Sequence, residues 1–202
     1  MKIIECKQND EIWEKARCGK ITSSGMSQII SPTGKASTQV SKYISRLIAE
    51  RIRGEKDGWA GNKHSDRGHE FEQEAVDYYA MLYDVEPQLV GFCLTDDETI
   101  GASPDRLIGG EGILEIKTCL SEIMIEHYEK DDPKAFLEQE HRPQTQCQLF
   151  VTDRKWVDTM LSISPLFFSV TTVLSSKFQP FSSCVAIYGI SDTRMFVPTQ
   201  WL

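Results

Sequence analysis

The sequence lacks several features that are typical of membrane proteins, secreted proteins or proteins stabilised by a bound metal. Its 202 residues contain no run of about 18 apolar residues, so we expect no membrane span. The first residues, MKIIECKQNDEIW, hold no apolar signal region, so we expect no export. The six cysteines include no C-x-x-C pair, which argues against a zinc or iron–sulfur site. Reduced thiols and a cytoplasmic location are therefore expected.

Positive charge is also scarce. The net charge is −8, and a basic surface typical of nucleic-acid-binding proteins does not follow from composition. An acidic exterior can nevertheless surround a locally basic channel. Hydrophobic residues make up 40% and charged residues 26% of the chain, which predicts one globular domain over 1–202.

The most informative stretch is 101–119, GASPDRLIGGEGILEIKTC. Its glycine-rich centre predicts a β-hairpin. In the second arm, Leu114 and Ile116 point to one face, whereas Glu115 and Lys117 point to the other. A carboxylate and an ammonium on one face of a strand predict a polar cleft.

A second carboxylate, Asp105, is expected near the end of the first arm of this hairpin. Asp105 and Glu115 supply the oxygen ligands that Mg²⁺ prefers, and Lys117 can hold a phosphate oxygen or a water. The spacing P-D-x9-E-x-K resembles the signature of the PD-(D/E)xK nuclease superfamily and predicts metal-assisted phosphodiester hydrolysis. An exposed hairpin with a surface Glu–Lys pair is the alternative.

The N-terminal part predicts a phosphate site. Asn9 or Asp10 is expected to cap a short helix. The polar turn 21–24 is expected to cap a second helix. Free N–H groups and hydroxyls there, including Thr22, would bind a phosphate beside Arg17. A plain N-cap with a surface arginine is the alternative reading.

Two further segments predict helices. The loop 31–39 carries Lys35, which could contact a polyanion, and a helix is expected over 41–53. The next helix, 67–84, is expected to bury a stripe of four residues: Phe71, Ala75, Tyr78 and Leu82. Glu72 is expected at the edge of that buried side. A carboxylate in such a place needs a partner, and a bound metal ion would be one. His69, one turn earlier, could contact a phosphate or water.

The second half of the chain predicts strands on either side of a helix. One or two strands are expected in 85–100, and a helix is expected to open at Pro143. Its Gln144 could orient an attacking water, although surface glutamines are common. The nearly uncharged segment 157–202 predicts short strands at 156–163, 168–174 and 184–190.

Five motifs in chain order resemble the lambda-exonuclease (YqaJ-type) family of viral and prophage alkaline exonucleases. They are R-x-G-x-I-T-S-S at 17–24, G-x-x-F-E-x-x-A at 68–75, S-P-D at 103–105, E-I-K at 115–117 and Q-x-Q at 144–146. The resemblance spans about 10–156 and implies an α/β fold with a PD-(D/E)xK restriction-endonuclease-like core, a mixed central β-sheet flanked by α-helices. The segment 157–202 departs from the charged helical end of the family.

The resemblance also implies roles for the matched residues. Asp105, Glu115 and the backbone carbonyl of Ile116 would bind Mg²⁺, for which Mn²⁺ could substitute. Glu72 would help to hold a second Mg²⁺. Lys117 and Gln144 would position and activate the attacking water. Arg17, Ser24 and Ser103 would bind a 5′-phosphate, with Thr22, Lys35 and His69 as further DNA contacts.

The family implies 5′-to-3′ degradation of one strand of linear duplex DNA to mononucleotides, with activity rising at alkaline pH. It further implies a homotrimer, a single-strand-annealing recombinase as partner, and a phage or prophage protein acting in a bacterial cell. A sequence-specific endonuclease on the same core and a non-catalytic DNA-end-binding module are the alternatives.

Overall fold

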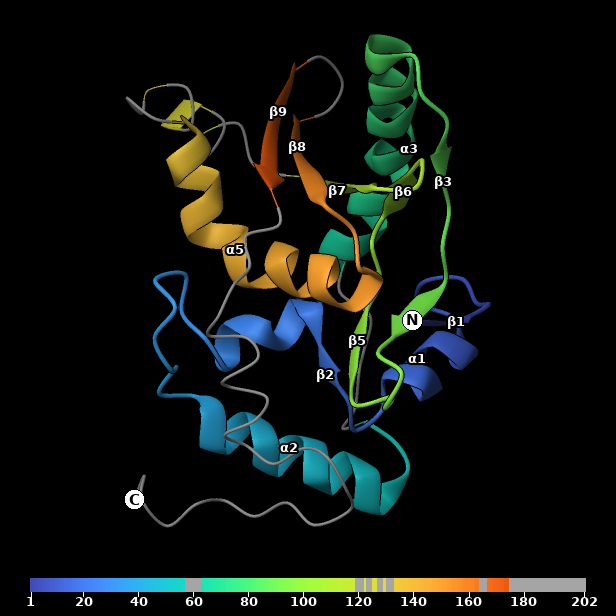
Figure 1. Cartoon of the computed structure of the whole chain (residues 1–202), viewed down its shortest axis with the longest axis vertical. Coiled ribbons are helices and arrows are strands. Elements are labelled where there is room, and N and C mark those ends of the chain that lie inside the picture. The colour runs from blue at the N-terminus through green and yellow to red at the C-terminus, as the bar shows by residue number, and fades with distance from the viewer. Residues whose placement is uncertain are drawn as a thin grey trace.

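The computed structural model of the chain describes residues 1–56, 63–118, 133–163 and 167–174, together with 122, 125, 126 and 129. Two β-sheets lie among helices in this part of the chain (Figure 1). Of the helices described, none is long and apolar enough to cross a membrane.

The first sheet has the strand order β1-β4-β5-β2. Its strands are β1 (Lys2–Ile4), β4 (Phe92–Leu94), β5 (Ile100–Ala102) and β2 (Ile21–Thr22). Only the β5–β2 pair is parallel. The helix α1 (Glu11–Arg17) packs on this sheet through Trp13, which contacts Phe92 and Leu94. Asp10 caps α1 by accepting a hydrogen bond from the Trp13 N–H at 2.7 Å, which confirms the expected cap.

The second sheet has the order β3-β6-β7-β8-β9 and carries the predicted hairpin. Its strands are β3 (Pro87–Gln88), β6 (Arg106–Ile108), β7 (Gly112–Thr118), β8 (Trp156–Ile163) and β9 (Phe167–Leu174). β6 and β7 are antiparallel, whereas β7 and β8 are parallel. The strands predicted at 156–163 and 168–174 are therefore confirmed and extend the hairpin sheet. The one predicted at 184–190 lies outside the described residues.

The hairpin begins later than the sequence predicted. The chain passes from β5 in the first sheet to β6 in the second at 103–105. Asp105 therefore lies before the first arm, at the crossing between sheets, and not near the end of that arm. The crossing lets its carboxylate accept a hydrogen bond from the backbone N–H of Ile116 on β7 at 2.7 Å.

The helix α3 (Lys63–Tyr83) presents a different face from the predicted one. Tyr78 and Leu82 are 37% and 51% exposed, while Ala75, Val76 and Tyr79 are buried against the second sheet. The prediction is therefore wrong at Tyr78 and Leu82 and right at Ala75, and the side chain of Phe71 lies outside the described residues. The orientation is set by a long-range contact, since the Tyr79 hydroxyl donates to the buried Asp158 carboxylate of β8 at 2.5 Å.

Three other helical segments complete the described fold. The segment η1 (Ser23–Gln28) is a 3₁₀-helix, and Thr22 makes no side-chain capping bond, so the predicted cap there is wrong. Gly25 of this segment is closely packed, because a Cβ there would lie 2.3 Å from the Tyr43 hydroxyl. The predicted helix near 41–53 is confirmed as α2 (Val40–Arg53).

The last helix, α5, spans Pro133–Thr152 and contains Pro143 inside it. The predicted opening at Pro143 is therefore wrong. The helix is continuous although Pro143 has no backbone N–H to donate. Gln144 and Gln148 therefore both lie on the packed part of α5. Cys147 and Leu149 of this part are buried in the cores beneath the two sheets.

The Tyr79–Asp158 contact yields a stability prediction. Tyr79→Phe removes the donor to a buried carboxylate whose Oδ1 has no hydrogen-bond partner within the described parts of the chain. We expect the free energy of unfolding, measured with urea, to fall by about 1–3 kcal/mol. Tyr83→Phe, on the same helix and 47% exposed, should change it by less than about 0.5 kcal/mol. Equal losses in the two variants would contradict the account.

Candidate active site

The centre of the site is the Glu115 carboxylate, which is only 3% exposed. Its Oε1 accepts hydrogen bonds from Lys117 Nζ at 2.6 Å and from Gln144 Nε2 at 2.5 Å. Its Oε2 accepts one from Gln148 Nε2 at 2.5 Å. Gln144 and Gln148 are one helical turn apart on α5, so both reach β7 from the same side. A buried negative charge is thus held at both oxygens by donors from two elements.

Gln148 was not selected from the sequence as a site residue. It is fully buried, and its Oε1 has no hydrogen-bond partner among the residues described. Its i+4 spacing from Gln144 was a signal that could have been used. The contact with Glu115 makes Gln148 a positioning residue for the carboxylate.

Asp105 lies beside this centre. Its Oδ2 accepts a hydrogen bond from the Ile116 N–H, the residue between Glu115 and Lys117. Burial raises the pKa of Asp105 well above its usual value, and the negative charge of Glu115 raises it further, while Lys117 opposes the shift. Two carboxylates held close together against their electrostatic repulsion are typical of a cation site.

The donor set fits a hard divalent cation. Asp105, Glu115 and the main chain at Ile116 offer oxygen ligands on neighbouring segments, and Mg²⁺ keeps several waters rather than requiring an all-protein cage. Within the described ranges, no three His, Cys, Asp or Glu side chains gather into a ready metal site. The residues therefore fit a site with few protein ligands, completed by water and substrate.

Lys117 and Gln144 point to the same place. Lys117 Nζ donates to Gln144 Oε1 at 3.1 Å as well as to Glu115. The structure thus brings together four residues that the sequence analysis selected from β7, α5 and the crossing before β6: Asp105, Glu115, Lys117 and Gln144.

Glu72 lies on another element, α3, and its negative charge contributes to the raised pKa of Asp105. Its Oε1 accepts a hydrogen bond from Arg106 Nη1 at 2.8 Å. Arg106 is 5% exposed and also donates to the Asp105 carbonyl at 2.6 Å and to Gln73 Oε1 at 3.2 Å. The sequence analysis did not select Arg106, although an arginine next to a predicted metal ligand in a short apolar strand is unusual.

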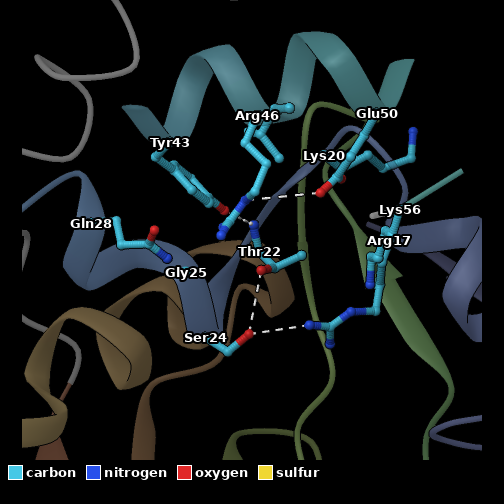
Figure 2. Close-up of a pocket in the computed structure, with 11 residues that line it drawn as sticks. Arg17, Lys20, Thr22, Ser24, Gly25, Gln28, Tyr43, Arg46, Glu50 and Lys56 are labelled. Carbon is cyan, nitrogen blue, oxygen red and sulfur yellow. Dashed lines mark hydrogen bonds and ion pairs between the residues drawn. The ribbon is translucent and has the colours of Figure 1, made fainter. Parts of the chain in front are cut away.

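Three of the predicted phosphate residues, Arg17, Thr22 and Ser24, form a second group, shown in Figure 2. Arg17 Nη2 donates to Ser24 Oγ at 3.2 Å, and Ser24 Oγ lies 3.3 Å from Thr22 Oγ1. They line a cavity of about 260 Å³ that is also lined by three cations, Lys20, Arg46 and Lys56, and by the Glu50 carboxylate, which lies 3.9 Å from Arg46. Arg17 Nε is buried and has no hydrogen-bond partner among the described residues. The cavity can therefore receive an anion.

Trp13 links this group to Ser103. The Arg17 guanidinium lies 3.8 Å from the centre of the Trp13 ring, and Trp13 Nε1 donates to Ser103 Oγ at 2.7 Å. Arg17 and Ser103 are thus both fixed by one buried indole. Trp13 was not selected from the sequence, because its link to Ser103 is a contact between residues 90 positions apart.

Two predicted DNA contacts are not brought into either group. Lys35 is exposed on the loop between η1 and α2 and does not line the cavity around Arg17. The side chain of His69 lies outside the described residues. Their predicted roles stay predictions.

Comparisons with known proteins place this geometry in a family. The YqaJ-like viral recombinase domain matches residues 12–155. The alkaline exonuclease LHK-Exo of Laribacter hongkongensis is 26% identical, with a TM-score of 0.72, 88% of this chain covered and 91% of that chain. LHK-Exo in complex with dAMP is 27% identical at a TM-score of 0.72, with 88% of each chain covered.

A phage-related exonuclease from Haemophilus somnus 129PT shares the fold at 13% identity and a TM-score of 0.60, with 83% of this chain and 90% of that chain covered. No protein of curated function matches. The predicted resemblance and the α/β nuclease fold are confirmed, with two sheets in place of the single one expected.

The raised pKa of Asp105 predicts a pH dependence of stability. An unfolded Asp has a pKa of about 3.9, so raising the pH from there through the higher folded pKa should lower the free energy of unfolding of the metal-free protein. Asp105→Asn should remove this fall and stabilise the protein at neutral pH by about 0.5–2 kcal/mol. Urea denaturation across a pH series, with exposed Asp153→Asn as the control, measures both effects. Parallel profiles for wild type and Asp105→Asn would contradict the account.

Proposed function

The chain belongs to the YqaJ-like viral recombinase family, and from that membership we propose that this nuclease is a Mg²⁺-dependent exonuclease acting on linear duplex DNA. It degrades one strand from the 5′ end to mononucleotides and leaves a 3′ single-stranded overhang. The observation that carries the proposal is the buried Glu115 carboxylate, held beside Asp105 and bonded to Lys117. The complex of LHK-Exo with dAMP, a deoxynucleoside monophosphate, supports mononucleotides as products.

The catalytic roles follow from these contacts. Asp105, Glu115 and the Ile116 carbonyl would hold Mg²⁺, which when bound polarises the scissile phosphate and lowers the pKa of a water. Gln144 Oε1 and Lys117 Nζ, which lie 3.1 Å apart, orient the attacking water. Lys117 also balances the negative charge that develops on the phosphate oxygens. Since Asp105 has a raised pKa and must be ionised to bind the ion, activity rises with pH.

Recognition of the 5′ end is assigned to the cavity around Arg17. Arg17 Nε, which has no hydrogen-bond partner among the described residues, and the Ser24 hydroxyl can both bond a terminal phosphate. Ser103 accepts a hydrogen bond from Trp13 and lies outside the lining of this cavity. A phosphate fixed at one end of the strand sets the polarity of degradation. The overhang that remains is the substrate of a single-strand-annealing recombinase, and both would act on DNA in the cytoplasm of a bacterial host.

We extend the proposal to a homotrimer, as the family resemblance implies. An exposed apolar surface on α3 and beside β3 supports contact with a second copy: Tyr78, Met81, Leu82 and Leu89. Light scattering that gives the 23.0 kDa mass of one chain would contradict this part of the proposal.

The test is an assay on linear duplex DNA in Mg²⁺ with either a 5′-phosphate or a 5′-hydroxyl. Loss of a charge-assisted hydrogen bond costs about 1.5–3 kcal/mol, so the phosphorylated end should be degraded about 10–100 times faster. Arg17→Ala should remove most of this preference, because it deletes the cavity cation that is bonded to Ser24. Lys15→Ala, exposed on the same helix, should keep it.

The alternatives give different products. Cutting of closed circular DNA would identify an endonuclease. Tight binding to DNA ends without any nucleotide release would identify an end-binding module.

A further inference from the structure

The two faces of β7 separate Glu115 from Glu72. Successive side chains of a strand point to opposite faces. Glu115 and Lys117 face α5, where Gln144 and Gln148 bind them. The alternate residues of β7 pack in one cluster with residues of α3: Leu114 and Ile116 with Ala75, Val76 and Tyr79. Glu72 precedes Val76 by one turn of α3 and so belongs to the opposite face from Glu115.

Arg106 holds Glu72 on that face. Arg106 pairs with Leu114 in the β6–β7 register, which directs it toward α3. Its guanidinium contacts three acceptors: Glu72 Oε1, Gln73 Oε1 and the Asp105 carbonyl. Glu72 and Arg106 also line a separate cavity of about 360 Å³, together with residues from the segment 5–8. Neither Asp105 nor Glu115 lines that cavity.

A metal ion coordinated by Glu72 would lie close to the positive charge of Arg106. Arginine stays protonated in proteins, and the side chain of Arg106 is 6% exposed, so losing its carboxylate would leave a buried, uncompensated charge. A metal about 2.1 Å from Glu72 Oε1 would lie within about 5 Å of Arg106 Nη1, since that nitrogen is 2.8 Å from the same oxygen. The guanidinium thus neutralises Glu72 through Oε1 and would repel a second cation bound at the same oxygen.

We propose that Arg106 acts as a positioning residue that withholds Glu72 from metal binding, so that this chain binds one divalent cation, at Asp105 and Glu115, instead of two. The inference rests on the proposed metal-dependent nuclease function and replaces the second ion expected from the family resemblance. It agrees with the absence of a three-acid cluster within the described ranges.

The experiment counts Mn²⁺ ions on the full chain by equilibrium binding and electron paramagnetic resonance, without DNA. Wild type should bind one ion with the spectrum of an isolated Mn²⁺. Glu72→Gln should keep that ion with an affinity changed less than about threefold, whereas Asp105→Asn should weaken it at least about tenfold. Arg106→Met, similar in length but uncharged, should gain a second ion and a spin-coupled spectrum, and Arg106→Lys should not.

Two ions in wild type, with one lost in Glu72→Gln, would overturn the inference and leave the proposed function standing. If Arg106→Met does not fold, as judged by circular dichroism, the numbers of Mn²⁺ ions bound by wild type and by Glu72→Gln still distinguish one metal site from two. Absence of bound Mn²⁺ in wild type, together with no degradation of linear DNA, would overturn the proposed function itself.

Discussion

The burial of the Glu115 carboxylate between β7 and α5 is the constraint on which the site depends. Removing a carboxylate from water costs several kcal/mol unless its oxygens are bonded. Lys117, Gln144 and Gln148 supply those bonds, two from α5 and one from the same strand. The placement of α5, and with it the continuous helix through Pro143, therefore sets the orientation of the metal-binding acid.

The same arrangement explains how an acidic chain can act on DNA. The net charge is −8, yet the cavity around Arg17 gathers cations from α1, α2 and the turns beside them. The acids that would bind the metal lie in a different place, on the second sheet and the crossing before it. Opposite charges are thus separated by the fold, with a cationic cavity for the strand end and an anionic centre for the metal.

Local spacing predicted much of this structure. The hairpin, the α1 cap at Asp10 and the strands after α5 depend on turns, alternation and capping, which the sequence encodes over a few residues. The motifs also placed Asp105, Glu115, Lys117 and Gln144 together correctly.

What could not be predicted depends on partners far away in the chain. On the buried face of α3, Tyr79 bonds Asp158, 79 residues further along the chain, and the apolar periodicity of the helix does not predict this contact. Trp13, Arg106 and Gln148 were not selected, because each gains its role only through a contact across elements. The helix that was expected to open at Pro143 begins at Pro133 and continues through that proline, although a proline inside a helix removes one backbone hydrogen bond.

The most direct measurement is nucleotide release from linear duplex DNA in Mg²⁺ by wild type, Lys117→Ala and Lys155→Ala. Lys117 contacts both Glu115 and Gln144, whereas Lys155 is exposed and pairs only with Glu111 among its ion pairs in the described structure. We predict that Lys117→Ala loses at least about 100-fold in rate and that Lys155→Ala matches wild type. Equal rates in all three proteins would contradict a phosphodiesterase centre at Asp105, Glu115 and Lys117.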